Sequence, residues 1–223
     1  MMNVQIVPTI TASTPFDYAH AITQLSFAPR LHVDVTDGQF APNLTVNLNQ
    51  IYFNRTEFAA THDGQTREID LHLMIKLPEK WLHQIVALNP TRAIFHAEIV
   101  GDNATKIRDY LAKFGIKFGV AILPKTSIVQ VVDMIKMADY VLIFGGHLGF
   151  QGGVANLTQL SKVSEIHVLN STCEIAWDGG ANAENLAQII AAGVNVVNVG
   201  SAIAGESDPE KAWSNLTRIA QTV

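Results

Sequence analysis

The chain has 223 residues and a formal net charge of −5, with 48% hydrophobic and 16% charged residues. An acidic chain lacks the basic surface that neutralises phosphates in a nucleic-acid-binding protein, and this class is excluded. The mean hydropathy is +0.19, but no apolar run approaches the roughly 18–20 residues of a membrane helix. A single cysteine, Cys173, excludes a disulfide framework and a thiolate zinc site. Because the first residues, MMNVQIVPTI, have no secretion signal, we expect a cytoplasmic protein that binds neither nucleic acid nor membrane.

Short apolar runs recur along the chain, and they are rich in β-branched and aromatic residues. Their apolarity is nearly continuous, which is typical of strands that are buried on both faces of a parallel sheet. A strand with one solvated face would instead alternate apolar and polar residues. We predict eight strands, at residues 4–8, 30–35, 69–75, 92–98, 117–122, 139–144, 173–177 and 195–200.

Segments with helical patterns lie between these runs, and the first opens with Thr14-Pro15, a favourable helix start. We predict helices over 14–25, 78–88, 102–115, 126–138, 182–193 and 207–221, and two with weaker patterns near 46–54 and 155–165. Eight strands alternating with eight helices are typical of an α/β fold, the (β/α)8 TIM barrel. We therefore expect residues 1–223 to form one such domain. A doubly wound open sheet has the same alternation, and periodicity leaves it open.

Two histidines and two aspartates lie near the ends of predicted strands, where a barrel places its reactive side chains. His32 and Asp34 are two residues apart, so they point to the same side of their strand. His72 lies in a run too apolar for the surface, and Asp178 immediately follows the seventh strand. Each one alone has an ordinary structural explanation, as a core or turn residue. Together they can converge on one point, and this nitrogen and oxygen set favours zinc, ferrous iron, manganese or cobalt.

Glycines follow the last three predicted strands, and loops in these positions often bind phosphate through backbone N–H groups. Glycine also marks any tight turn, so each cluster alone is weak evidence. Three clusters on adjacent loops indicate a phosphorylated small substrate. The clusters are Gly149, Gly152 and Gly153, then Gly179 and Gly180, then Gly200 followed by Ser201.

Short motifs spread over nearly the whole chain carry a resemblance to a known family. They are Pro8-Thr9-Ile10, His32-Val33-Asp34-Val35-Thr36-Asp37-Gly38, Phe40-Ala41-Pro42-Asn43, Asp70-Leu71-His72-Leu73-Met74, His96-Ala97-Glu98, Asp178-Gly179-Gly180 and Gly200-Ser201. In this order they resemble the ribulose-phosphate 3-epimerase family. Phosphate-binding barrels that decarboxylate carry Asp-x-Lys-x-x-Asp on a strand, and this chain has Val35 and Thr36 after Asp34 instead of that lysine.

The resemblance implies a TIM barrel of the ribulose-phosphate-binding type and one divalent metal ion held by four side chains, His32, Asp34, His72 and Asp178. It also implies that the two aspartates act as an acid/base pair on opposite faces of the substrate, and that the protein forms a homo-oligomer. The implied reaction inverts C3 of a phosphorylated ketose, with conversion of D-ribulose 5-phosphate to D-xylulose 5-phosphate as the first candidate. The residues assigned to substrate or phosphate binding are Thr9, Met74, Gly149, Gly152, Gly179, Gly180, Gly200 and Ser201.

The chain departs from the family where the family places its substrate wall. Thr36 and Phe144 replace two of its three methionines, and Leu123 replaces an asparagine. These changes predict an altered specificity, with a hexulose phosphate such as D-allulose 6-phosphate as the alternative substrate.

The loop at 145–153 also differs, since it carries His147, Leu148 and Gln151 in place of the family's residues. A loop that fails to close over substrate would make the chain a non-catalytic sugar-phosphate-binding protein. A decarboxylating or aldol-cleaving barrel enzyme is the remaining alternative, and the missing strand lysine argues against it.

Overall fold

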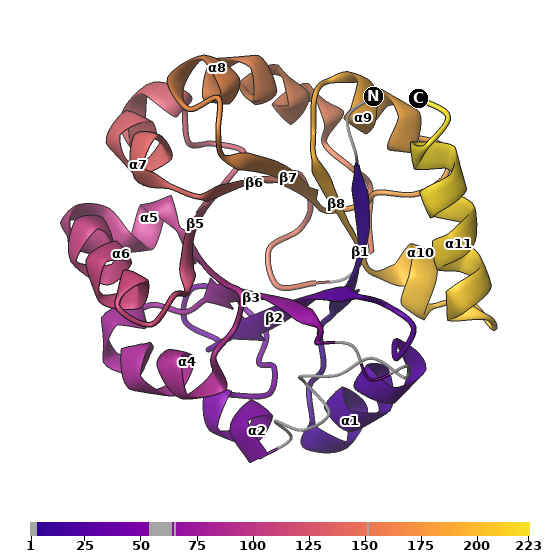
Figure 1. Cartoon of the computed structure of the whole chain (residues 1–223), viewed down its shortest axis with the longest axis horizontal. Helices are drawn as coiled ribbons and strands as arrows, with labels where there is room; N and C mark the ends of the chain where they lie inside the picture. The colour runs from indigo at the N-terminus through magenta and orange to yellow at the C-terminus, as the bar shows by residue number, and fades with distance from the viewer. Residues whose placement is uncertain (1–3, 54–63, 65, 151) are drawn as a thin grey trace.

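The computed structural model describes the chain except residues 1–3, 54–63, 65 and 151. Eight parallel strands close into a barrel in chain order, with β8 paired to β1 (Figure 1). The predicted TIM barrel is confirmed, because the pairing of the first and last strands excludes an open doubly wound sheet. The strands are β1 Gln5–Ile10, β2 Arg30–Thr36, β3 Glu68–Met74, β4 Arg92–His96, β5 Lys117–Ile122, β6 Tyr140–Phe144, β7 Glu174–Asp178 and β8 Val196–Val199.

Helices surround the barrel, as Figure 1 shows. The first begins as predicted, because the side chain of Thr14 caps it by accepting a hydrogen bond from the backbone N–H of Asp17. None of the helices in the described part of the chain is long and apolar enough to cross a membrane. The helices are α1 Pro15–Gln24, α2 Leu48–Phe53, α4 Leu82–Leu88, α5 Ala97–Val100, α6 Ala104–Ala112, α7 Val132–Met137, α8 Ser161–Leu169, α9 Leu186–Ala191, α10 Ser201–Ala204 and α11 Pro209–Ala220. The 3-10 turns are η1 Pro78–Trp81, η2 Gly101–Asn103, η3 Ile128–Val131 and η4 Leu157–Leu160.

Several predicted element bounds differ from the structure. The fourth strand ends at His96 rather than at residue 98, and α5 starts at once with Ala97. The helix predicted near 155–165 lies later, as η4 followed by α8, and the short helix α10 was not predicted. The helix expected to end at Asn54 is α2, and Asn54 itself lies outside the described residues.

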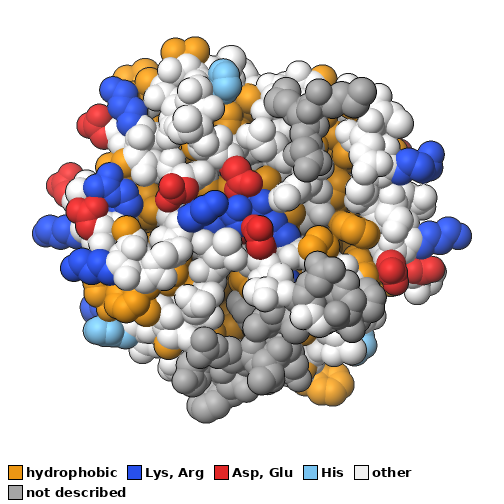
Figure 2. Space-filling model, in the orientation of Figure 1, with side chains coloured by type: hydrophobic (Ala, Val, Ile, Leu, Met, Phe, Trp, Pro, Cys, Tyr) orange, Lys and Arg blue, Asp and Glu red, His pale blue; other side chains and the backbone are white. Residues whose placement is uncertain are grey.

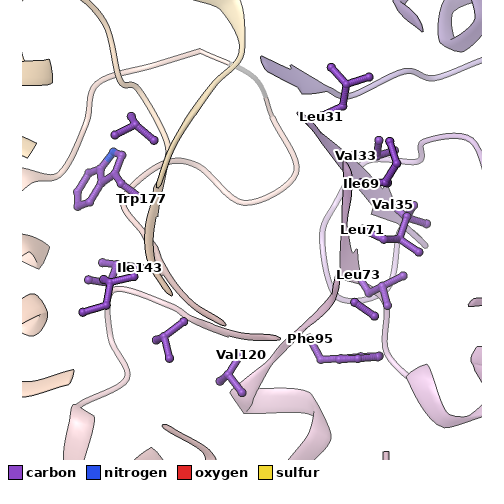
Figure 3. Close-up of a cluster of buried hydrophobic side chains, with 14 of the residues drawn as sticks. Leu31, Val33, Val35, Ile69, Leu71, Leu73, Phe95, Val120, Ile143 and Trp177 are labelled. Carbon is purple, nitrogen blue, oxygen red and sulfur yellow. The ribbon is translucent and has the colours of Figure 1, made fainter. Parts of the chain in front are cut away.

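Alternate residues of the strands face opposite sides of the barrel wall. Figure 3 shows Leu31, Val33 and Val35 of β2 pointing away from the barrel centre, with Ile69, Leu71 and Leu73 of β3 beside them. These side chains are buried, and burial of such a side chain contributes about 1.5–3 kcal/mol. The residues between them, His32 and Asp34, therefore face the barrel interior.

The barrel interior has an apolar layer with charged residues on one side of it. Val7, Ile94 and Leu142 belong to this apolar layer. At the amino ends of the strands, Asp70 is fully buried and bonds both Arg30, 2.8 Å away, and Arg92, 3.2 Å away. Basic and acidic side chains lie side by side at the centre of the face in Figure 2. The ionic layer is defined here by Arg30, Asp70, Arg92, Glu68 and Glu174.

Candidate metal and acid/base site

The four residues proposed as metal ligands come together at the carboxyl ends of three strands. Their ligand atoms lie within 4.8 Å of one another, and all four side chains are buried. The register of β2 and β3 explains why Asp34 and His72 lie together, because they are direct neighbours on the two strands. Asp178 reaches the cluster from β7, on the other side of the barrel. The metal-ligand cluster is defined here as His32, Asp34, His72 and Asp178.

The donor atoms of the metal-ligand cluster face one another. Nε2 of His32 and Nδ1 of His72 are 3.2 Å apart, and they lie 3.3 Å and 2.9 Å from the same Oδ1 of Asp34. Oδ2 of Asp178 lies 3.9 Å from His32 and 3.8 Å from His72. Ligands of a tetrahedral zinc ion with 2.0–2.1 Å bonds are about 3.4 Å apart. The spacing and the nitrogen and oxygen donors therefore fit a divalent ion.

The electrostatic surroundings of the cluster shift the pKa values of its members in different directions. Burial alone would raise the pKa of Asp34, but hydrogen bonds from His32 and His72 hold it well below its usual range. Burial raises the pKa of Asp178 to about 6, and the charge of Asp34 adds to the rise. Burial disfavours the charged His32 ring, yet its bond to Asp34 raises the pKa of this histidine above 6.5. Nearby groups thus make the carboxyl group of Asp34 more acidic than that of Asp178.

Three side chains behind the cluster were not assigned any role from the sequence. Thr11 donates a hydrogen bond of 2.7 Å to Oδ2 of Asp34. Nε2 of His96 lies 2.9 Å from Nε2 of His72, and Glu98 lies 3.5 Å from the other nitrogen of His96. Burial lowers the pKa of His96 to about 4. The inward alternation of β4 was a usable signal for His96, because Ile94 two residues earlier faces the interior.

A small cavity opens beside the metal-ligand cluster. Seven of the eight residues assigned to substrate or phosphate binding line it, and Ser201 is outside its described lining. Phe144 also lines the cavity, whereas Thr36 and Leu123 do not belong to its described lining. Asn198 and Phe150 are lining residues that the sequence reasoning missed. The lining is Thr9, Asp34, Met74, Phe144, Gly149, Phe150, Gly152, Asp178, Gly179, Gly180, Asn198 and Gly200.

The loops after β6 and β7 touch at the cavity through glycines. Gly179 has a φ of 117°, and a Cβ atom there would overlap the backbone of Gly146. The two loops are also joined by a hydrogen bond of 2.7 Å from the N–H of Gly145 to the carbonyl of Asp178. The close backbone contact between Gly146 and Gly179 explains why these loop positions require glycine. His147 of the first loop is exposed, and Gln151 lies outside the described residues.

Comparisons with known proteins agree with this architecture. A sequence model described as the ribulose-phosphate 3 epimerase family matches residues 5–204. Ribulose-phosphate 3-epimerase from Mycobacterium leprae (strain TN) is 31% identical, over 100% of this chain and 97% of that protein. The Mycobacterium bovis (strain ATCC BAA-935 / AF2122/97) protein of the same name is 32% identical, over 96% and 92%. The crystal structure of 3-hexulose-6-phosphate synthase from Salmonella typhimurium shares the fold at 12% identity, with a TM-score of 0.71 over 98% of this chain and 99% of that one. The chain belongs to the ribulose-phosphate 3-epimerase family.

Proposed function

We propose that the protein is a metal-dependent epimerase that interconverts D-ribulose 5-phosphate and D-xylulose 5-phosphate by inverting C3. Family membership makes the chain an isomerase. The observation that carries the proposal is the pair of buried carboxyl groups, Asp34 on β2 and Asp178 on β7, which line one cavity beside two histidines. Inversion at one carbon needs a proton-transfer group on each face of that carbon, and two carboxyl groups meet this need.

Removal of the C3 proton requires stabilisation of the developing negative charge, because the C–H bond next to a ketone is a very weak acid. A divalent ion held by His32, Asp34, His72 and Asp178 would act as a Lewis acid toward the ketone. One aspartate then removes the C3 proton, and the other returns a proton to the opposite face. Asp34 on β2 and Asp178 on β7 both line the cavity, which supports one carboxyl group acting on each face of the substrate.

The glycine loops are proposed to bind the phosphate group of the substrate. Gly149 and Gly152 after β6, Gly179 and Gly180 after β7, and Gly200 after β8 line the same cavity. Backbone N–H groups approach an anion most closely where no side chain intervenes. The cavity of about 30 Å³ has room for roughly two water molecules. Residues of its lining must therefore move when a sugar phosphate enters.

Three further features are proposed. The ion is zinc, ferrous iron, manganese or cobalt, because the same nitrogen and oxygen donors accept all four. The protein forms a homo-oligomer and works in the cytoplasm. Sedimentation equilibrium of the metal-loaded protein measures the oligomeric state directly, and a monomer at all concentrations would contradict the proposed homo-oligomer.

Proton NMR of the metal-loaded protein with D-ribulose 5-phosphate in heavy water tests the proposed reaction. We expect deuterium to enter at C3 while D-xylulose 5-phosphate appears. Asp34→Asn and Asp178→Asn should each abolish inversion, whereas Asp133→Asn on the exposed face of α7 should leave it unchanged. The metal content of each variant is measured as well, because both aspartates belong to the metal-ligand cluster.

The outcomes separate the alternative functions. Inversion of D-allulose 6-phosphate without inversion of the pentulose phosphate would replace the proposed substrate with the hexulose phosphate. Tight binding of both sugars with no deuterium exchange, in protein that holds its metal, would favour a non-catalytic binding protein. Inversion that persists in a metal-containing Asp178→Asn variant would contradict the two-carboxylate mechanism.

A further inference from the structure

A row of three side chains leads away from the metal-ligand cluster toward the helix side of β4. His72 lies in the cluster, and its Nε2 is 2.9 Å from Nε2 of His96. Nδ1 of His96 is in turn 3.5 Å from Oε2 of Glu98, a residue of α5. Neither His96 nor Glu98 lines the cavity, so the proposed reaction gives these residues no direct task.

A metal ion on Nδ1 of His72 would set the direction of the hydrogen bonds in this row. Nδ1 of His72 faces the other ligand atoms of the cluster, and a histidine nitrogen binds metal only through its free lone pair. With the ion bound there, the proton of the His72 ring would be on Nε2. The two Nε2 atoms are close enough for one proton between them, so His96 would accept that proton and carry its own on Nδ1. Nδ1 of His96 makes no hydrogen bond within the described residues, and Oε2 of Glu98, 3.5 Å away, is a carboxylate acceptor facing it.

Glu98 and His96 are both held in place by groups outside the cluster. Oε1 of Glu98 accepts hydrogen bonds from the hydroxyl of Thr126 and, at 3.0 Å, from the backbone N–H of Leu123. This leaves Oε2 facing His96. The His96 ring is fully buried and packs against Phe40 at a centroid distance of 4.7 Å. The acceptor side of the row is therefore fixed before any ion binds.

We propose that His96 and Glu98 are positioning residues that accept the Nε2 proton of His72, so that Nδ1 of this ring can exchange its contact with Asp34 for a metal ion. The inference rests on the metal site of the proposed function. A carboxylate or carbonyl behind a ligating histidine commonly fixes the ring in this way, and here a second histidine transmits the effect. Without this acceptor an Nε2 proton would be buried with no partner, and the tautomer whose Nδ1–H bonds Asp34 would compete with metal binding.

Metal affinity of three variants tests the proposal without use of the substrate. His96→Leu removes the acceptor, and we expect the dissociation constant for Co²⁺, measured by chelator competition, to rise about 10- to 100-fold. Glu98→Gln should raise it by a smaller factor. His96→Gln retains both an acceptor and a donor in the side chain and should restore most of the affinity. Tyr140→Phe, at an equally buried position inside the barrel, is the matched control and should bind Co²⁺ like the unchanged protein.

Two further readouts separate positioning from a general loss of structure. Histidine nitrogen NMR of the Zn²⁺-loaded protein should show His72 bound through Nδ1 and protonated at Nε2, and His96→Leu should weaken or abolish this pattern. The Co²⁺ absorption spectrum should change in His96→Leu and return to the original shape in His96→Gln. Thermal unfolding of each metal-free variant reports whether the barrel remains folded.

The proposal is overturned if His72 of the unchanged Zn²⁺-loaded protein carries no proton on Nε2. It is also overturned if folded His96→Leu binds Co²⁺ as tightly as the Tyr140→Phe control. Should His96→Leu fail to fold, the tautomer of the unchanged protein and the affinity of Glu98→Gln still decide the matter. Failure of the epimerase proposal looks different, because Co²⁺ binding would then depend on His96 while no sugar phosphate is inverted.

Discussion

The two aspartates at the barrel mouth occupy different surroundings although both are buried. Asp34 accepts hydrogen bonds from His72 and from the hydroxyl of Thr11. Asp178 lies farther from both histidines, at 3.8 and 3.9 Å. Donors that touch a carboxylate stabilise its charge, whereas burial without such donors opposes it. The difference in acidity between the two groups therefore follows from their distances to a few donors.

This difference predicts how metal binding depends on pH. A metal ion requires ionised Asp178 and neutral His32. Burial raises the pKa of Asp178 to about 6, and the contact with Asp34 raises the pKa of His32 above its usual value although burial opposes this. As the pH falls, protons occupy both ligand atoms and compete with the ion. We expect Co²⁺ affinity to decrease as the pH falls, most steeply below about pH 6, with a slope approaching about 100-fold per pH unit once both groups bind protons. Calorimetric titration from pH 5 to 8 measures this slope, and a flat profile would contradict the ligand assignment.

At the scale of elements, the loops after β6 and β7 form one unit at the cavity. Each has glycine where the backbone of the other approaches, and a hydrogen bond joins Gly145 to Asp178. A change in one loop is thus transmitted to the position of the proposed acid/base residue Asp178. Such coupling requires close backbone contact, which a side chain at the contact would prevent.

Alanine substitution separates the effect of this contact from ordinary backbone strain. Gly115 has a φ of 71° with nothing near its added Cβ, so Gly115→Ala should cost about 1–2 kcal/mol of stability through strain alone. Gly179→Ala carries strain and also an overlap with Gly146, and we expect a larger loss together with loss of C3 inversion. Urea unfolding and the NMR assay measure the two effects. Equal losses of stability in the two variants, with inversion intact, would show that the loops do not depend on this contact.

The sequence predicted the elements well where one pattern sufficed and less well where two elements meet. Continuous apolarity identified all eight strands, but Ala97, Ile99 and Val100 of α5 continue the apolar character of the fourth run, so the end of β4 at His96 was not visible. The cluster of His32 and Asp34 was predictable because a two-residue spacing places both on one side of a strand. Thr11 and Glu98 were not, because their bonds depend on how separate strands and loops are positioned relative to each other.

At the scale of the whole molecule, the two ends of the barrel have different chemistry. The mouth holds the metal-ligand cluster, and the opposite end holds the ionic layer around Asp70. Asp70 and His72 are two residues apart on β3, so one strand contributes to both ends through the same face. The guanidinium groups of Arg30 and Arg92 also lie 5.6 and 5.9 Å from the ring of Tyr140. The ionic layer thus lies at the end of the barrel opposite the metal-ligand cluster.

Asp70→Asn tests whether the ionic layer contributes only to the stability of the fold and not to metal binding. The change leaves two buried guanidinium groups without their shared carboxylate, and breaking such a buried pair costs about 3–5 kcal/mol. Asp109→Asn breaks an exposed pair with Arg108 and should cost less than about 1 kcal/mol. We expect Co²⁺ affinity to be unchanged in folded Asp70→Asn. A loss of stability no greater than that of the control, or a loss of metal binding, would contradict this separation.

The alternation of side chains along β2 also affects how the protein can evolve. Val33 and Asp34 are adjacent in the chain, but Val33 packs on the outside of the barrel wall and Asp34 belongs to the metal-ligand cluster inside it. Substitutions at these neighbouring positions should therefore act separately, one on packing volume and the other on reactivity. Repacking of the outer layer can accumulate without altering the reaction, and a new substrate can be acquired through inward-facing positions such as Phe144 and Asn198 while the helices keep their contacts.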